Sequence, residues 1–258
     1  MARLRFFGML VVTGAILALA IQPIVAESTK IDSSTITAGA TGKMKAVLMT
    51  PEGAGPFPAI LVLQNSTGEQ PEDMGFARRL VREGYVVLVP YFLDAYEIKS
   101  SAPQTAFTTH AEAIYADLTA SLDLLRKNSK VNGKKLGAIG FSNGGYFALW
   151  LAATSQVQAS ASFYGALTGA GTDDSMTRFR KVFNDKSSPV LILHGETNFT
   201  VPVAKAVELS AILTSAGTPL DFHAYRSAGG REAGSASQDT AGDAWILSRD
   251  FFRKNLKK

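Results

Sequence analysis

The sequence predicts an α/β fold with a mostly parallel central sheet and helices on both faces. Two observations lead to this prediction. Fully apolar runs of strand length recur along the chain, and segments with helical spacing of apolar residues alternate with them. Strands that alternate with helices are joined by right-handed crossovers, so neighbouring strands run parallel. Ligands of such sheets bind beyond the carboxyl ends of the strands.

The expected strands follow a polar, Ser/Thr-rich lead-in from Glu27 to Thr41. The first strand spans Met44 to Met49, and the apolar run from Ala59 to Leu63 is typical of a strand buried on both faces. Further strands are expected at Tyr85–Val89, Leu136–Ile139, Ala159–Tyr164, Pro189–Leu193 and Leu220–Tyr225. No repeat or internal linker interrupts this order, which predicts one domain over residues 27–258.

The expected helices lie between these strands. One begins near Pro71, has acidic residues in its first turn and stops at Gly84. A long amphipathic helix is predicted from Gln104 to Lys127. Polar residues dominate Thr168 to Lys186, which has room for one helix and could cap a cleft. The remaining helices are expected from Asn143 to about Thr154, at Val203–Thr214 and at Ala241–Leu256.

Composition excludes several kinds of site. The 258 residues include no cysteine, which rules out disulfides, thiolate metal sites and a cysteine nucleophile. No group of His, Asp and Glu has metal-ligand spacing, so we expect no metal and no cofactor. The net charge of +4 includes Arg3 and Arg5. The basic C-terminal residues are typical of a solvated helix end, and we expect no nucleic-acid partner.

The N-terminus has the pattern of a secretory signal. Basic residues precede an apolar run from Phe6 to Ile21, and a proline and small residues follow it. Cleavage is expected after Ala26, which predicts a secreted or periplasmic protein with no membrane association after cleavage. An uncleaved membrane anchor is the alternative, although the run is somewhat short to span a bilayer.

The most informative stretch runs from Lys134 to Ala152. A short apolar strand ends in Gly140-Phe141-Ser142-Asn143-Gly144, and a helical pattern follows directly. This is the G-x-S-x-G nucleophile elbow, in which glycines let strand and helix pass closely on either side of a strained serine. Ser142 is therefore the candidate nucleophile. The backbone N–H of Asn143, at the start of the helix, would form half of an oxyanion hole.

The chain resembles the dienelactone hydrolase family of the α/β-hydrolase superfamily over nearly all of residues 27–258. Four segments carry the resemblance: FARRLVREGYVVLVPYF, KLGAIGFSNGG, PVLILHGETNFTVP and DAWILSRDFF. The resemblance implies an α/β-hydrolase fold and hydrolysis of a small-molecule ester or lactone through a covalent acyl-enzyme. It places the nucleophile at Ser142 and the second oxyanion donor at the backbone N–H of Ser66.

The same resemblance predicts an incomplete catalytic triad. The family's acid falls on Asn198, and its histidine falls on about Gly230, with no histidine from there to the C-terminus. A glutamate that some members carry falls on Asn65. A serine hydroxyl is a weak nucleophile without a neighbouring base, so we expect weak or absent esterase activity.

Other residues leave alternatives open. Either His194 bonds the loop that follows it, or it contacts the substrate or serves as a recruited base; His223 and His110 are weaker candidates for that base. Glu196 is either a carboxylate near Ser142 or a solvated loop charge. Tyr91 and Phe92 either line an apolar substrate pocket or cover the core.

Two functions from different classes remain. One is an exported hydrolase with a non-standard base. The other is a pseudo-enzyme that binds a small ligand or a protein partner in the retained cleft, with an engineered or drifted inactive variant as a weaker third possibility. The sequence does not predict an oligomeric state.

Overall fold

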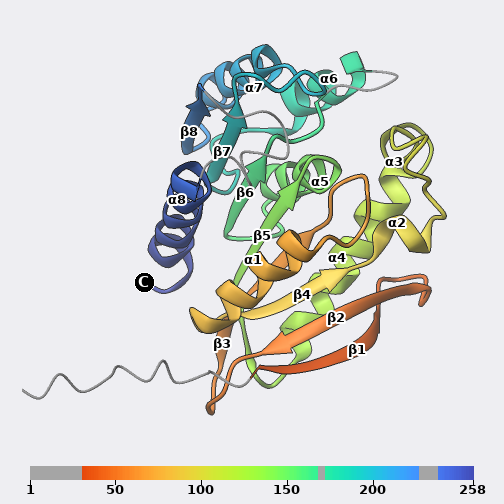
Figure 1. Cartoon of the computed structure of the whole chain (residues 1–258), viewed down its shortest axis with the longest axis vertical. Coiled ribbons are helices and arrows are strands. Elements are labelled where there is room, and N and C mark those ends of the chain that lie inside the picture. Colours follow the sequence, from red (N-terminus) through yellow and green to blue (C-terminus); the bar gives the residue numbers. More distant parts are fainter. Residues whose placement is uncertain (1–30, 168–171, 227–237) are drawn as a thin grey trace, which may run out of the picture.

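The computed structural model describes residues 31–167, 172–226 and 238–258. Eight strands form one sheet in the order β1-β2-β4-β3-β5-β6-β7-β8. Strands β3 to β8 pair in parallel, and β2 runs antiparallel to both β1 and β4. The strands are β1 (Asp32–Ala38), β2 (Met44–Thr50), β3 (Phe57–Leu63), β4 (Val86–Pro90), β5 (Val131–Phe141), β6 (Ala159–Phe163), β7 (Val190–Gly195) and β8 (Leu220–Tyr225). In Figure 1, β1 and β8 lie at opposite edges of the twisted sheet.

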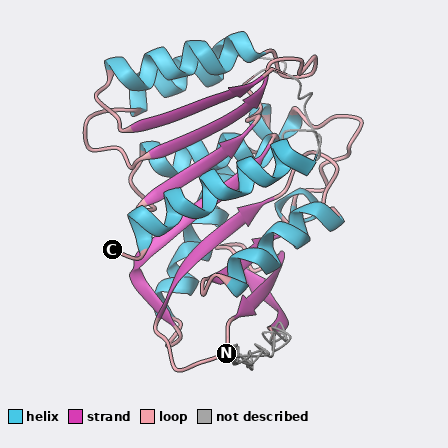
Figure 2. Ribbon diagram, turned by 60° about the vertical axis from the view of Figure 1, so that its left-hand side comes forward, coloured by secondary structure: helices cyan, strands magenta, loops and turns pink. Residues whose placement is uncertain are grey.

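Helices cover both faces of the sheet, as Figure 2 shows. One face carries α1 (Pro71–Arg82) and α8 (Gln238–Leu256), and the other carries α4 (Ala111–Lys127) and α5 (Asn143–Ala153). Successive strand residues point to opposite faces: Ile60 packs with the α1 and α8 side chains, and Leu61 packs with the α4 and α5 side chains. The other helices are α2 (Phe92–Ala95), α3 (Thr105–Thr108), α6 (Thr172–Val182) and α7 (Val203–Ser215).

The helix predicted from Gln104 to Lys127 is wrong in its first part. The structure breaks it into α3 and α4, with a turn at Thr109 and His110. The threonine hydroxyls bond backward to main-chain carbonyls, from Thr105 to Ala102 at 2.9 Å and from Thr108 to Gln104 at 3.3 Å. Such bonds offer the backbone an alternative to a continuous helix.

Other differences concern short or polar elements. The lead-in predicted to be merely extended contains β1, which pairs with β2 from Asp32 opposite Thr50 to Ala38 opposite Met44. This edge strand is polar and largely exposed, so it lacks the apolar pattern of the inner strands. The segment after β4, which contains Phe92, forms the one-turn helix α2. The segment from Thr168 to Lys186 contains α6, in agreement with the room expected there for one helix. Residues 168–171 of that segment lie outside the described residues.

Four neighbouring strands present the candidate site. The ends of β3, β5, β6 and β7 are adjacent in the sheet, and they lead into Ser66, Ser142, Tyr164 and Asn198. Because parallel strands end at the same edge, residues far apart in sequence meet there. Among the described helices, none is long and apolar enough to cross a bilayer.

Candidate active site

Ser142 occupies a strained turn between β5 and α5, so the predicted strand, turn and helix are confirmed. Its φ is 49° and its ψ is −111°, a conformation that residues with a side chain rarely adopt. Such strain costs on the order of 1–3 kcal/mol and persists only where surrounding structure imposes it. Here Ser142 N donates to Phe163 O at 3.0 Å, and Ala166 N donates to Ser142 O at 2.9 Å. Both bonds tie the turn to the end of β6.

The glycines around Ser142 are required by close backbone contacts. A Cβ on Gly140 would lie 2.1 Å from the carbonyl carbon of Gly144, and a Cβ on Gly144 would lie 2.2 Å from Leu63 O. The amide of Gly144 donates to Gln64 O at 2.9 Å. The first turn of α5 therefore packs directly on the end of β3. This contact brings Ser142 and the loop that contains Ser66 to the same place.

The loop after β3 is shaped by the Asn65 side chain. Asn65 Oδ1 accepts hydrogen bonds from Thr67 N at 2.8 Å and Thr67 Oγ1 at 2.5 Å. On its other side, Asn65 Nδ2 lies 3.5 Å from the buried carboxylate of Asp73 in α1. These contacts form a turn with half-buried Ser66 inside it. The Ser66 amide is thus held on a structured loop facing the elbow.

The loop after β7 is fixed by Asn198 and His194. Asn198 Oδ1 accepts hydrogen bonds from Thr200 N at 3.0 Å and Val201 N at 2.9 Å. His194 Nε2 lies 2.8 Å from Val201 O and must donate, because a carbonyl oxygen only accepts. His194 is 0% exposed, and burial lowers the pKa of its imidazole, while the bond to Val201 opposes that shift.

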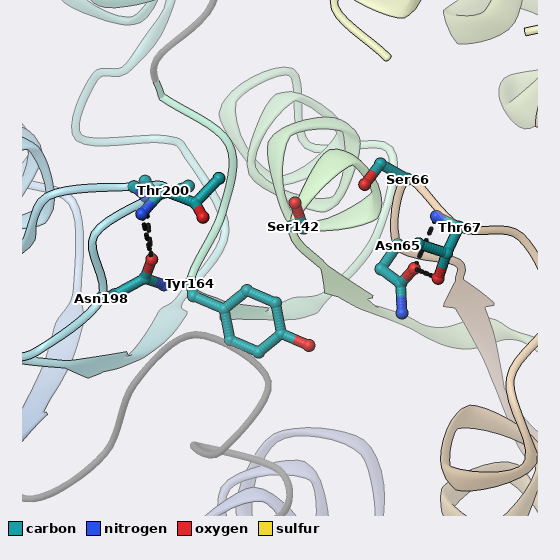
Figure 3. A pocket seen from close by; sticks show the side chains of 8 residues that line it. Asn65, Ser66, Thr67, Ser142, Tyr164, Asn198 and Thr200 are labelled. Carbon is teal, nitrogen blue, oxygen red and sulfur yellow. Dashed lines mark hydrogen bonds between the residues drawn. The ribbon is translucent and has the colours of Figure 1, made fainter. Parts of the chain in front are cut away.

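A pocket of about 220 Å³ lies between the two loops. Figure 3 shows Ser142 between Ser66 on one side and the Asn198 loop on the other. Within the described part of the chain, no hydrogen bond to another residue involves the Ser142 hydroxyl, and the side chains that line the pocket carry no formal charge. The lining consists of Asn65, Ser66, Thr67, Ser142, Tyr164, Asn198, Thr200 and Val201.

Comparison with known proteins agrees with this geometry. The sequence profile of the dienelactone hydrolase family matches residues 44–256. The chain belongs to the dienelactone hydrolase family. A relative from Methylorubrum extorquens, described as a carboxymethylenebutenolidase, is 28% identical over 256 residues, which cover 92% of this chain and 88% of the relative.

Solved structures show the same α/β-hydrolase fold. A structure described as a dienelactone hydrolase from Klebsiella pneumoniae has a TM-score of 0.72 and 21% identity, covering 87% of this chain and 99% of that one. A dienelactone hydrolase-like promiscuous phosphotriesterase from metagenomic libraries has a TM-score of 0.71 and 20% identity, covering 87% and 98%. Family membership makes the chain a hydrolase of the dienelactone hydrolase type, a class that acts on ester or lactone bonds.

The structure brings together four residues that the family resemblance singled out: Ser142, Ser66, Asn65 and Asn198 all line the pocket. Asn143 follows Ser142 as the first residue of α5, and its side-chain amide donates to Pro103 O at 3.2 Å. Gly230, the residue at the family's histidine position, lies outside the described residues.

Three predicted substrate contacts are not among the residues that line the pocket. Phe92 is 0% exposed and packs its ring 5.5 Å from that of Phe147, because α2 turns it into the core. His194 is equally buried and does not line the pocket; its bond to Val201 matches the structural alternative. Tyr91 is half-buried, and its hydroxyl bonds to Glu69 rather than reaching the pocket lining.

The other candidates, His110, His223 and Glu196, are also absent from the pocket lining. His110 occupies the N-cap position of α4 without a side-chain capping bond, and its ring lies 5.3 Å from that of Tyr96, measured between ring centroids. His223 is half-buried in β8 opposite Leu193. Glu196 is exposed. Across the described ranges, no three His, Asp or Glu side chains form a group that could hold a metal ion.

Sequence reasoning missed four lining residues: Thr67, Tyr164, Thr200 and Val201. Tyr164 has a φ of 38°, and its amide donates to Leu193 O at 2.8 Å. Figure 3 shows its ring along the floor of the pocket beside Asn198. Its place directly after a strand could have identified it, because such positions face ligands in parallel sheets.

Proposed function

We propose that this family member hydrolyses small, uncharged esters or lactones with Ser142 as the nucleophile. The observation that carries the proposal is the strained Ser142 turn, which opens into a pocket between the Ser66 and Asn198 loops. Ser142 Oγ attacks the acyl carbon, the acyl C–O bond breaks, and the serine proton ends on the leaving alcohol. Water then hydrolyses the acyl-enzyme to release the acid and restore the serine.

The oxyanion hole in this proposal consists of two backbone N–H groups, from Ser66 and Asn143. Asn143 begins α5, so its amide is at the positive end of an eleven-residue helix. The Ser66 amide belongs to the turn built by Asn65. Donors that are already fixed need no reorganisation as charge develops, and removing one such donor typically costs about 10²–10³ in turnover.

Slow turnover is part of the proposal. Asn198 stands at the family's acid position, and its side-chain oxygen already accepts two backbone amides. Gly230 stands at the histidine position. Loss of the base from such a triad costs about a millionfold, leaving roughly 10³–10⁴ over water from the oxyanion hole and binding.

The uncharged lining supports an uncharged substrate. A carboxylate taken into this pocket would lose hydration without meeting a cationic partner among the described lining residues. A neutral ester or lactone needs only hydrogen-bond donors at its carbonyl oxygen, and the two proposed amides supply them.

A ligand-binding protein without turnover is the second candidate. The hydrogen bonds of Asn198 favour this second candidate. Its side-chain oxygen accepts two amides of its own loop, and among the described residues its side chain has no bond to a histidine. Under this alternative the same pocket holds a small carbonyl compound that is never cleaved.

Hydrolysis of an activated ester separates the two candidates. The wild-type protein, Ser142→Ala and the double variant Asn198→Asp with Gly230→His are compared. Catalysis predicts turnover that Ser142→Ala removes and the double variant raises. Turnover that Ser142→Ala leaves intact contradicts the proposal. If the wild type shows no ester hydrolysis and the double variant does, the binding protein is favoured.

We also propose that the chain is exported, with residues 1–26 as the signal and residues 27–258 as one domain. The support is the basic start followed by the apolar run from Phe6 to Ile21. N-terminal sequencing of the protein recovered from outside the cytoplasm should begin at Glu27. A chain that retains Met1 after export would contradict cleavage at Ala26.

A further inference from the structure

One exposed aromatic side chain belongs to the loop that forms one side of the pocket. Phe199 is 96% exposed, compared with 50% for Val207 and 46% for Ile246, the other large exposed apolar side chains among the described residues. Single exposed apolar residues are common on protein surfaces, so exposure alone carries no conclusion. The position of Phe199 in the chain is the informative feature.

Phe199 lies between two residues that line the pocket, Asn198 and Thr200. The loop that carries it is fixed at several points. Asn198 Oδ1 accepts the amides of Thr200 and Val201, Asn198 N donates to Gly195 O at 3.2 Å, and His194 binds Val201 O. The aromatic ring is therefore presented to solvent from a backbone that is already ordered.

The pocket itself is small. Its volume of about 220 Å³ is below the roughly 300–1,000 Å³ of typical small-molecule sites. A substrate with its carbonyl at Ser142 and a bulky substituent would extend out of this pocket, which the Asn198–Val201 loop lines on one side. On that loop, Phe199 is the large apolar side chain that is exposed to solvent.

We propose that Phe199 determines specificity by packing its ring against an apolar, preferably aromatic, group of an uncharged ester bound at Ser142. This inference rests on the proposed function and adds a substrate class to it. Contact would remove both apolar surfaces from water, and aromatic pairs gain further from edge or offset packing. Because the loop is already ordered, little conformational freedom is lost when the ligand arrives.

The test measures binding of intact esters to Ser142→Ala protein. Ethyl 4-phenylbutyrate and ethyl butyrate form a matched pair that differs only in the terminal ring. Adding Phe199→Ala should weaken binding of ethyl 4-phenylbutyrate by about three- to tenfold and that of ethyl butyrate by less than about twofold. Val207→Ala, an exposed apolar change on α7, is the control and should alter neither affinity.

Equal weakening of both esters, or no change in either, would overturn the inference. Phe199→Tyr should retain the preference for the phenyl ester because it keeps the ring. A separate measurement of ester turnover by protein with Ser142 intact tests the proposed function. Absent turnover with a preserved binding preference would count against catalysis alone, whereas turnover with an unchanged preference in Phe199→Ala would count against Phe199 alone.

Discussion

The side-chain oxygen of Asn198 lies 2.9 Å from the backbone nitrogen of Val201 and accepts its hydrogen bond. Asn198 also accepts the amide of Thr200 and is only 5% exposed. The residue at the family's acid position therefore holds together the loop that forms one side of the pocket. This arrangement leads to a prediction about stability that does not depend on catalysis.

Asn198→Ala should lower the free energy of unfolding by about 1–3 kcal/mol, because the buried amide of Val201 and the part-buried amide of Thr200 lose their acceptor. Denaturant unfolding followed by circular dichroism measures the change. Asn198→Asp keeps an acceptor oxygen and should lose much less stability. If the alanine and aspartate variants were equally stable, the role assigned to the Asn198 oxygen would be wrong.

Stability should fall as the solution is acidified, because the pKa of His194 is lowered by burial. In the unfolded chain this imidazole takes up a proton near its ordinary pKa of about 6.5, whereas the folded protein resists protonation until lower pH. The contribution of His194 is therefore complete above that pH and is lost progressively below it. One proton can add a slope of at most about 1.4 kcal/mol per pH unit.

Comparison with His194→Gln isolates this effect from other titrating groups. Glutamine can donate to Val201 O but does not titrate, so its stability should depend less steeply on pH between 7 and about 5. Denaturant melts at several pH values provide the test. If the unfolding free energies of wild type and variant depended equally on pH, the lowered pKa assigned to buried His194 would be wrong.

Gly144→Ala should destabilise the protein strongly, because its new Cβ would lie 2.2 Å from Leu63 O. Backbone atoms of a buried strand must move to accept it, at a cost of about 1–3 kcal/mol or more. Thermal unfolding measures the loss. Gly75→Ala in α1 is the matched control: its Cβ meets nothing within 4 Å, and it should stabilise the helix by about 0.5–1 kcal/mol.

Asn65→Ala should reduce ester turnover by about ten- to a hundredfold, because the Ser66 amide would lose its fixed position. Asn128→Ala removes a similar turn, in which Asn128 Oδ1 accepts Lys130 N at 2.9 Å, far from the pocket lining. Steady-state kinetics on a soluble ester compare the two. A similar loss in both variants would point to general destabilisation, not to a displaced Ser66 amide.

The sequence predicted those parts of the fold that depend on local chemistry. The elbow was recognisable because its G-x-S-x-G spacing lies within five residues, and Gly140 meets Gly144 inside that stretch. The contact of Gly144 with Leu63 O, by contrast, depends on the tertiary fold. The buried strands were recognisable from their apolar runs. Strand β1 was missed because its residues are mostly polar, and its pairing depends on β2.

The rest of the site depends on tertiary arrangement. Phe92 is an aromatic residue directly after a strand, a position that suits a pocket residue, but α2 directs its side chain into the core. Tyr164 lines the pocket because β6 lies between β5 and β7, a strand order that cannot be read from the sequence. The use of Asn198 as an acceptor for its own loop likewise required the loop geometry.

The nucleophilic role of Ser142 is tested most directly by trapping its acyl-enzyme. The protein is mixed with an activated ester, quenched in acid and analysed by mass spectrometry. We expect one added acyl group, located on the peptide that contains Ser142 and absent from Ser142→Ala. An acyl group on another residue, or identical ester turnover by wild type and Ser142→Ala with no adduct on Ser142, would contradict the account.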